Sequence, residues 1–289
     1  MKKVVLINGK EQFKLSVFNR LTQFGDGLFE TCVVKDSNLL FWATHFARLE
    51  RGRVQLKINK INEKQWIKDI NKALGLAGLK QAVVKIILSR GESERGYGFK
   101  NNIKPTRIVI ISAMPKPTVG SYTLSICKSG YANNSLLSNI KHCNRLEQIL
   151  ARTELNSDEC IMLNENGHVI SVTQGNIFGV KSGELFTPKL DKSGIEGTRR
   201  MQVLKIAKVL ELKVNINKLT LQDLYDCDEI FVTNSVLGIH SVDHIDKKHF
   251  SQKSVTKQLE NALKKESLKE ENAQILKPKK HFMKKNLSV

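Results

Sequence analysis

The stretch Asn139-Ile140-Lys141-His142-Cys143-Asn144-Arg145-Leu146-Glu147-Gln148 is the most informative part of this sequence. Asn144, with Glu147 three residues later, predicts a helix N-cap with a capping box. Apolar residues then recur at helical spacing, at Leu146, Ile149 and Leu150. Lys141 is therefore expected just before a helix. A lysine near apolar residues loses its proton easily and can attack a carbonyl carbon. Most lysines are solvated surface charges, so the other segments must decide its role.

Size and charge narrow the classes of protein. The chain has 289 residues and is 40% hydrophobic, which is enough for two domains with real cores. Its formal net charge of +19 suggests nucleic acid, an acidic membrane surface or an anionic small-molecule substrate as partner. The lysines are scattered, with a concentration in the C-terminal tail, and no arginine-rich helix, ribonucleoprotein signature or zinc-finger spacing is found. We therefore expect an anionic small molecule as partner and no nucleic acid.

Cysteine usage and the apolar runs bear on the compartment. None of the five cysteines forms a C-x-x-C pair, so a disulfide framework or a zinc site is not expected. The apolar run at the N-terminus is too short for a signal peptide, and no run approaches the length of a membrane span. The sequence predicts a cytoplasmic protein with no metal and no membrane partner.

The first part of the chain alternates strands and helices. A hairpin is expected at 4–7 with a turn at Asn8-Gly9, and a glycine-flanked loop at 24–27 leads into a strand that ends near 34. Thr44 is a plausible N-cap for a helix that carries His45 and Arg48 on one face, which by itself would be a solvated face. The remaining expected elements are a helix at 63–75, strands at 82–88 and 108–112, and a polar loop at 89–98 between these strands.

Residues 115–121 are expected to form a linker, beyond which the pattern changes. Four short strands, at 159–163, 168–172, 177–181 and 184–187, predict a β-meander. The glycine-containing turn 194–200 then leads into a helix that ends near 212, an arrangement that favours an anion at the helix start. A strand at 229–233, a loop with Asn234-Ser235 and a polar helix from about 251 follow. We assign a small N-terminal α/β domain to 1–114, a larger domain to 122–265 and a basic tail to 266–289.

Together these segments resemble the fold-type IV pyridoxal-phosphate enzymes, most closely the aminodeoxychorismate lyases, over about residues 5–245. The most specific match is the stretch 140–148 around Lys141, which is close to the Lys-His-Leu-Asn-Arg-Leu-Glu-Gln of those lyases. Further matches lie at 22–31, at 89–97, at Asn176-Ile177-Phe178 and at 194–200. The resemblance implies an α/β (α+β) fold of two α/β domains, with pyridoxal 5'-phosphate in the interdomain cleft, and a homodimer with its sites near the subunit interface.

The resemblance also implies roles for individual residues. Lys141 would carry the cofactor and then act as general base, and the Thr31 hydroxyl would help to protonate the leaving group. Related branched-chain aminotransferases have glycine at the position of Thr31, so this residue favours a lyase. Two residues of the loop at 89–98 would meet the substrate carboxylates: Arg95 and Tyr97. The cofactor phosphate would be held by Arg48, Gly197, Thr198, Arg199 and Ser235.

One position departs from the family pattern. Ser171 stands where the family places a glutamate against the pyridine nitrogen of the cofactor. A serine hydroxyl can form a hydrogen bond there but cannot supply the negative charge that keeps this nitrogen protonated. Two interpretations follow: a lyase for which a weaker electron sink suffices, because product aromatisation drives the elimination, or a slow or repurposed paralogue.

The sequence therefore predicts a lyase that converts 4-amino-4-deoxychorismate to 4-aminobenzoate and pyruvate, a step of folate biosynthesis. The first alternative is a branched-chain or D-amino-acid aminotransferase of the same fold, although transamination depends more on a protonated ring. The second is a basic protein without enzymatic activity that binds nucleic acid through its lysines, with an affinity that falls steeply with salt.

Overall fold

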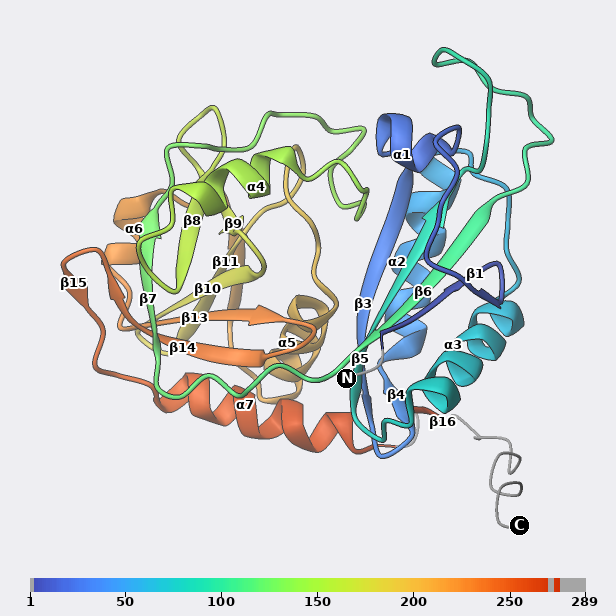
Figure 1. Cartoon of the computed structure of the whole chain (residues 1–289). Helices are drawn as coiled ribbons and strands as arrows, with labels where there is room; N and C mark the ends of the chain where they lie inside the picture. The colour runs from blue at the N-terminus through green and yellow to red at the C-terminus, as the bar shows by residue number, and fades with distance from the viewer. Residues whose placement is uncertain (1–2, 270–272, 276–289) are drawn as a thin grey trace, which may run out of the picture.

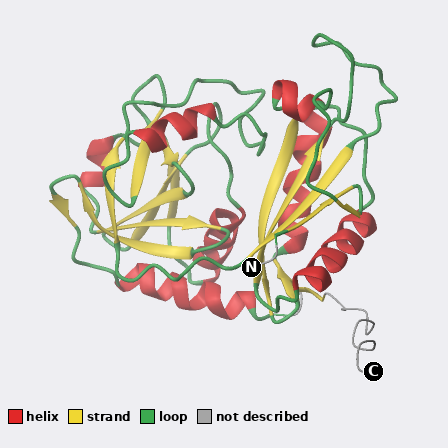
Figure 2. Cartoon of the chain, viewed as in Figure 1, coloured by secondary structure: helices red, strands yellow, loops and turns green. Residues whose placement is uncertain are grey.

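The computed structural model describes residues 3–269 and 273–275 of the chain. Two sheets form the two halves of the molecule, each with its own helices (Figures 1 and 2). In the described part of the chain, the first sheet has seven strands in the order β16-β4-β3-β5-β6-β1-β2. The second has nine, in the order β12-β11-β10-β13-β14-β7-β8-β9 with β15 paired to β14. Residues 113–121 connect the two halves and contain no helix or strand.

The elements of the first half, in chain order, are β1 (Val4–Ile7), β2 (Lys10–Glu11), α1 (Arg20–Phe24), β3 (Gly27–Lys35), β4 (Asn38–Leu40), α2 (Trp42–Gln55), α3 (Glu63–Ala77), β5 (Ala82–Ser89) and β6 (Thr106–Ser112). The β1–β2 hairpin is as predicted, and both of its turn residues, Asn8 and Gly9, have positive φ. The helix expected from Thr44 begins earlier, at Trp42, with Phe41 as N-cap. Asn62 caps α3 through its side chain, which accepts a hydrogen bond from the Lys64 N–H.

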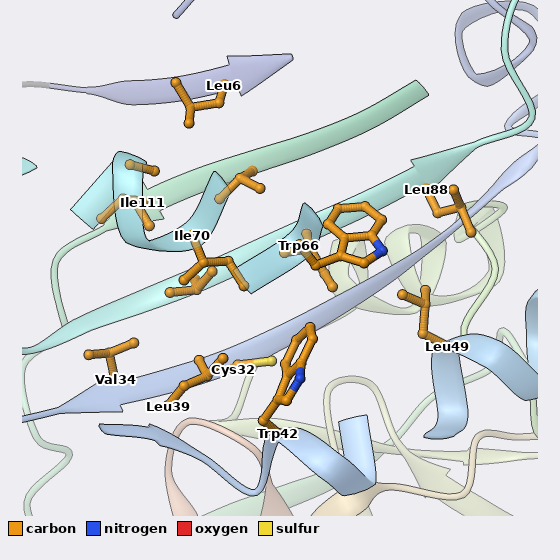
Figure 3. Close-up of a cluster of buried hydrophobic side chains, with 14 of the residues drawn as sticks. Leu6, Cys32, Val34, Leu39, Trp42, Leu49, Trp66, Ile70, Leu88 and Ile111 are labelled. Atoms are coloured by element: carbon orange, nitrogen blue, oxygen red, sulfur yellow. The ribbon is translucent and has the colours of Figure 1, made fainter. Parts of the chain in front are cut away.

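Side-chain alternation along β3 decides which of its residues face the core and which face the second half of the molecule. Successive residues of a strand point to opposite faces. Cys32 and Val34 point into the core that α2 and α3 build with the sheet (Figure 3), and Leu28 belongs to the same core. Trp42 of α2 and Trp66 of α3 are almost fully buried in this core. Glu30 shares the α2 side of the sheet, whereas Phe29 and Thr31 point away from these helices, towards the second half of the molecule.

The elements of the second half are β7 (Tyr122–Ile126), α4 (Leu146–Thr153), β8 (Glu159–Leu163), β9 (Val169–Val172), β10 (Asn176–Lys181), β11 (Glu184–Pro188), α5 (Thr198–Val209), β12 (Val214–Asn217), α6 (Leu221–Tyr225), β13 (Glu229–Asn234), β14 (Gly238–Ile245), β15 (Lys248–His249) and α7 (Ser254–Ser267). Helices α5 and α7 pack together with β10 and β13 around a core that includes Phe178 and Phe231, whose rings stack with centroids 4.8 Å apart.

The predicted β-meander is wrong, although all four strands exist. β8 pairs with β9 and β10 pairs with β11, but β13, β14 and β7 lie between these two hairpins in the sheet. The parallel pairs of β7 with β14 and with β8 bring the strand after the connection into the middle of the sheet. Such pairings between distant segments cannot be read from the local strand pattern.

Two further expectations differ from the structure. Residues 273–275, assigned to a basic tail, form β16 (Ala273–Ile275), which pairs antiparallel with β4 at the edge of the first sheet. The basic stretch 277–285 lies outside the described residues. Cys127 and Cys160 are paired as a disulfide, with Cα atoms 5.6 Å apart, whereas the sequence predicted no disulfide framework. Within the described ranges, no helix has the length and apolar character needed to cross a membrane.

Candidate active site

A cavity of about 580 Å³ lies between the two halves of the molecule. The first half contributes Phe29 and Thr31 from β3 and Arg48 from α2. The second half supplies residues from five places: Tyr131 in the loop after β7, the segment from Lys141 into α4, the β9–β10 turn, the start of α5 and the loop after β13. Eight of the ten residues predicted for the site line this cavity: Thr31, Arg48, Lys141, Ser171, Gly197, Thr198, Arg199 and Ser235.

Backbone pairing with β3 holds Lys141 in place. The Phe29 N–H donates to the Lys141 carbonyl at 2.9 Å, and the Cys143 N–H donates to the Gly27 carbonyl at 2.9 Å. The stretch around Lys141 thus contacts the stretch 24–31, the second of the motifs singled out in the sequence. The Lys141 ammonium lies 4.4 Å from the centroid of the Phe29 ring.

The environment of Lys141 makes its amine reactive near neutral pH. Burial removes the ammonium from water, and the nearby charge of Arg48 adds repulsion, so the pKa of Lys141 falls from 10.5 to about 7. Glu30 opposes this effect, and Arg145 and Lys85 add to it. A substantial fraction of this amine is therefore unprotonated at pH 7, as a nucleophile or general base requires.

Arg48 is fixed by a buried carboxylate. Glu30 accepts hydrogen bonds from Arg48 Nε at 2.7 Å and Nη2 at 2.6 Å, and pairs with His45 Nδ1 at 2.6 Å. Although burial alone would raise it, Arg48 and His45 hold the pKa of Glu30 down at about 2. Burial lowers the pKa of His45 to about 4. The helix pattern alone predicted a solvated face for His45 and Arg48. Both side chains are buried instead.

An anion-binding cup forms at the start of α5. The Thr198 hydroxyl lies 2.9 Å from the Ser235 hydroxyl and 3.4 Å from His45 Nε2. Gly197 precedes the helix, and no side chain caps it, so the first helical N–H groups remain available to an anion. Asn176 shapes this turn, because its side chain accepts from the Gly197 N–H at 3.0 Å and donates to the Ile195 carbonyl at 2.9 Å.

Gly197 cannot be replaced here without a steric conflict. A Cβ atom at this position would lie 2.1 Å from Asn176 Oδ1. Arg199 follows in the first turn of α5, with its guanidinium 4.2 Å from the centroid of the Phe41 ring and Nη2 donating to the Ser235 carbonyl at 3.2 Å. Its Nη1 is buried and has no hydrogen-bond partner among the described residues. Burial lowers the pKa of Arg199 to about 10, so it remains a cation at neutral pH.

Ser171 is buried in the opposite wall. Its hydroxyl donates to the Val172 carbonyl at 2.8 Å, and the Tyr131 hydroxyl lies 3.0 Å from Ser171 Oγ. Because the proton of Ser171 is used by Val172, the Tyr131 hydroxyl acts as the donor between these two groups. This wall of the cavity therefore offers neutral hydroxyls where the family pattern has a carboxylate.

The sequence model of the family described as amino-transferase class IV matches residues 27–245. The chain belongs to the class IV aminotransferase family. Within this family, it is 33% identical to an aminodeoxychorismate lyase of Vibrio harveyi over 83% of this chain and 90% of the relative. It is 30% identical to a putative branched-chain-amino-acid aminotransferase of Methanocaldococcus jannaschii over 90% of this chain and 95% of the relative.

A solved structure agrees with the lyase similarity. The 4-amino-4-deoxychorismate lyase of Pseudomonas aeruginosa superposes with a TM-score of 0.85 at 31% identity, over 91% of this chain and 98% of that one. The predicted resemblance and the class IV aminotransferase fold are thus confirmed. The assigned roles of the individual site residues are a separate matter and remain predictions.

Arg95 and Tyr97 do not line the cavity of their own chain. Both are exposed on the loop between β5 and β6, and 83% of Tyr97 is accessible. Arg20 anchors this loop by donating to the Tyr97 carbonyl at 3.0 Å, and Phe24 packs against the Tyr97 ring with centroids 5.4 Å apart. Within one chain, the structure does not bring these two side chains together with Lys141.

The structure adds residues that the sequence prediction missed. Glu30 and His45 hold Arg48, Asn176 shapes the α5 turn, and the cavity wall also includes polar side chains of Tyr131, Arg145 and Gln148. Arg145 and Gln148 belong to the same ten-residue stretch as Lys141. Their spacing of three residues at a helix start, which places both side chains on one face, is the signal that could have identified them.

Proposed function

We propose that this protein is a pyridoxal-phosphate-dependent lyase that converts 4-amino-4-deoxychorismate to 4-aminobenzoate and pyruvate. The observation that carries the proposal is the shared position of Lys141 and Thr31, which line one cavity from adjacent backbone segments. Lys141 provides an amine with a pKa of about 7, and Thr31 provides a hydroxyl that does not depend on pH. The similarity to two aminodeoxychorismate lyases, at 33% sequence identity and at a TM-score of 0.85, supports the same choice.

The cavity has the features that pyridoxal phosphate requires. The cup of Gly197, Thr198, Ser235 and the first N–H groups of α5 suits a phosphate. Arg199 Nη1 is a buried donor without a partner, which a phosphate oxygen would satisfy. Arg48 adds a fixed positive charge, and Lys141 offers the amine to which the cofactor aldehyde would attach.

The side chains divide the proposed chemistry between them. Bound pyridoxal phosphate supplies a reactive aldehyde and a ring that accepts electron density. Lys141 Nζ takes the proton from carbon 4 of the substrate, which its lowered pKa allows at neutral pH. The Thr31 hydroxyl donates a proton towards the departing enolpyruvate. Ser171 offers the ring nitrogen a hydroxyl in place of a carboxylate, which is compatible with an elimination that product aromatisation drives.

The competing function is amino transfer, which the similarity to a putative branched-chain aminotransferase supports. Both activities are measured on one preparation, with 4-amino-4-deoxychorismate in one assay and a panel of amino donors and keto acids in the other. We expect 4-aminobenzoate in the first assay and no more than a trace of amino transfer in the second. Amino transfer from isoleucine or D-alanine without release of 4-aminobenzoate would replace the lyase proposal by the aminotransferase alternative.

We also infer a homodimer. Helix α4 exposes three large apolar side chains: Leu146 at 73%, Ile149 at 56% and Leu150 at 55%. Ile149 also lines the cavity, whereas Leu146 and Leu150 do not. Leu136, five residues before Lys141, is also 70% exposed. Apolar patches of this kind mark protein interfaces. In such a dimer, Arg95 and Tyr97 would contact the substrate of the partner subunit, since neither residue lines the cavity of its own chain. Light scattering on the wild type and on Leu146→Asp/Leu150→Asp tests this inference, and a monomeric wild type would refute it.

A further inference from the structure

The arginines that line the cavity fall into two groups. Arg48 is paired with Glu30 at 2.6 Å and Arg152 with Glu159 at 3.3 Å. Among the described residues, Arg145 and Arg199 have no carboxylate partner within ion-pair distance, and each has one buried guanidinium nitrogen without a hydrogen bond. Since buried charges are normally paired, each of these guanidinium groups calls for an anionic group that the protein itself does not supply.

Arg199 lies in the anion-binding cup, but Arg145 lies in a different part of the wall. Its Nε donates to the His142 carbonyl at 2.8 Å, which fixes the guanidinium, while Nη2 is buried and unpartnered. The same wall carries Tyr131 and Ser171, which satisfy each other and the Val172 carbonyl and offer no negative charge to Arg145.

Gln148 lies one helical turn after Arg145 and has the same property. The residue is only 9% exposed, and neither Nε2 nor Oε1 has a hydrogen-bond partner among the described residues. The Gln148 side chain lies close enough to Tyr131 to oppose the rise that burial causes in the pKa of the Tyr131 hydroxyl. A buried amide with both ends unsatisfied is costly. Two neighbouring side chains thus present unsatisfied polar atoms at the cavity that contains Lys141.

We propose that Arg145 and Gln148 form a second anion-binding subsite, separate from the cup at α5, that binds an anionic oxygen. The oxygen belongs either to a carboxylate of the substrate or to the ring hydroxyl of pyridoxal phosphate, and this assignment rests on the proposed function. Arg145 contributes a charge-assisted hydrogen bond from Nη2 and Gln148 contributes one from Nε2. The two uncompensated guanidinium groups of the cavity then serve two different anionic groups.

Two binding constants distinguish the sources of this oxygen. The first is the dissociation constant of pyridoxal phosphate from the protein. The second is the dissociation constant of chorismate from the cofactor-saturated protein, because chorismate has both carboxylates but no amine to react. Each is measured for the wild type, Arg145→Met, Arg145→Lys and Gln148→Leu, with circular dichroism as the check on folding. Lysine keeps the charge and is expected to restore part of the binding.

A substrate carboxylate predicts that Arg145→Met weakens chorismate binding roughly tenfold or more and changes cofactor binding less than about twofold. If the oxygen belongs to the cofactor, Arg145→Met should instead weaken cofactor binding roughly tenfold or more and change chorismate binding less than about twofold. Arg53→Met is the matched control, since Arg53 is paired with Glu50 at 2.9 Å and does not line the cavity. It should leave both constants unchanged.

The subsite is overturned if Arg145→Met and Gln148→Leu fold normally and leave both constants at the wild-type values. A wild type that binds neither probe overturns it as well. Failure of the proposed function gives a different result. If the wild type binds chorismate through Arg145 but releases no 4-aminobenzoate from 4-amino-4-deoxychorismate, the lyase proposal fails and the subsite stands.

Discussion

Glu30 and Arg48 form a buried ion pair in which the carboxylate accepts from Nε at 2.7 Å and from Nη2 at 2.6 Å. Glu30 is 0% and Arg48 is 3% exposed, so water cannot replace either partner. The pair joins β3 to α2 directly beneath the anion-binding cup, and Arg48 Nη1 continues the contact to the Glu196 carbonyl at 2.9 Å. The position of Arg48 in the cavity therefore depends on Glu30.

Glu30→Gln is expected to destabilise the protein. Removing one charge of a buried pair leaves the other uncompensated, at a cost of about 3–5 kcal/mol in the free energy of unfolding. Urea denaturation measures this change. Glu50→Gln is the control, because the pair of Glu50 with Arg53 is partly exposed and its loss should cost less than about 1 kcal/mol. If Glu30→Gln and Glu50→Gln lower the free energy of unfolding by the same amount, the buried charge of Arg48 does not depend on Glu30 for its stability.

Stability should fall as the pH is lowered from 7 to 4. The pKa of His45 is about 4 in the folded protein and 6.5 in the unfolded chain. Between pH 6.5 and pH 4 the unfolded chain therefore binds a proton that the folded protein does not, and lowering the pH favours unfolding. The pKa of Glu30 is about 2 against 4.5, so its contribution is lost below pH 4.5. The groups around His45 are Glu30, Arg48, Arg199 and Thr198. Urea denaturation of His45→Gln should show a smaller pH dependence between 6.5 and 4, and an unchanged slope would contradict this assignment.

Gly197→Ala should damage the anion-binding cup. The added Cβ meets Asn176 Oδ1 at 2.1 Å, and relief of that overlap must break the hydrogen bonds that shape the turn before α5. We expect a loss of about 1–3 kcal/mol in stability and weaker binding of pyridoxal phosphate, measured by its absorbance. Gly75→Ala is the matched control: it lies inside α3 with no atom within 4 Å of the added Cβ, and it should stabilise by about 0.5–1 kcal/mol.

Lys141 should react with aldehydes at a lower pH than other lysines. Its pKa of about 7 predicts that attachment of pyridoxal phosphate, fixed by borohydride, rises through pH 7 and levels off near pH 8. Peptide mass spectrometry gives the extent of labelling at Lys141 and at Lys64, a lysine on an exposed part of α3. If labelling at Lys141 follows the pH profile of Lys64, the lowered pKa is wrong.

The sequence predicted many of the elements, because strand alternation and glycine turns are local signals. Eight of the ten predicted site residues line the cavity, and these came from the family resemblance. The predicted capping box of Asn144 and Glu147 is wrong. Arg145 is the N-cap of α4, the Asn144 side chain donates to the Gly25 carbonyl at 3.3 Å, and Glu147 accepts from the Ala132 N–H at 3.1 Å. Both predicted capping residues have tertiary partners instead, and a single sequence does not reveal these.

The same limit applies to the buried polar residues. His45 and Arg48 lie on one helix face as predicted, but their burial depends on Glu30, which the alternation of β3 directs to that face. The apolar residues of α4 correctly predicted a helix, yet Leu146 and Leu150 face outwards. Helical periodicity shows that a helix has an apolar face and does not say whether its partner is a core or another subunit.

The most direct test of the proposed function follows both products from 4-amino-4-deoxychorismate with the cofactor-saturated protein. The account predicts that 4-aminobenzoate and pyruvate appear in equal amounts, and that Lys141→Ala abolishes both while the protein remains folded. Thr31→Gly should reduce the rate by roughly a hundredfold, as expected for loss of a proton donor. Release of neither product by the wild type, or undiminished release by Lys141→Ala, would contradict it.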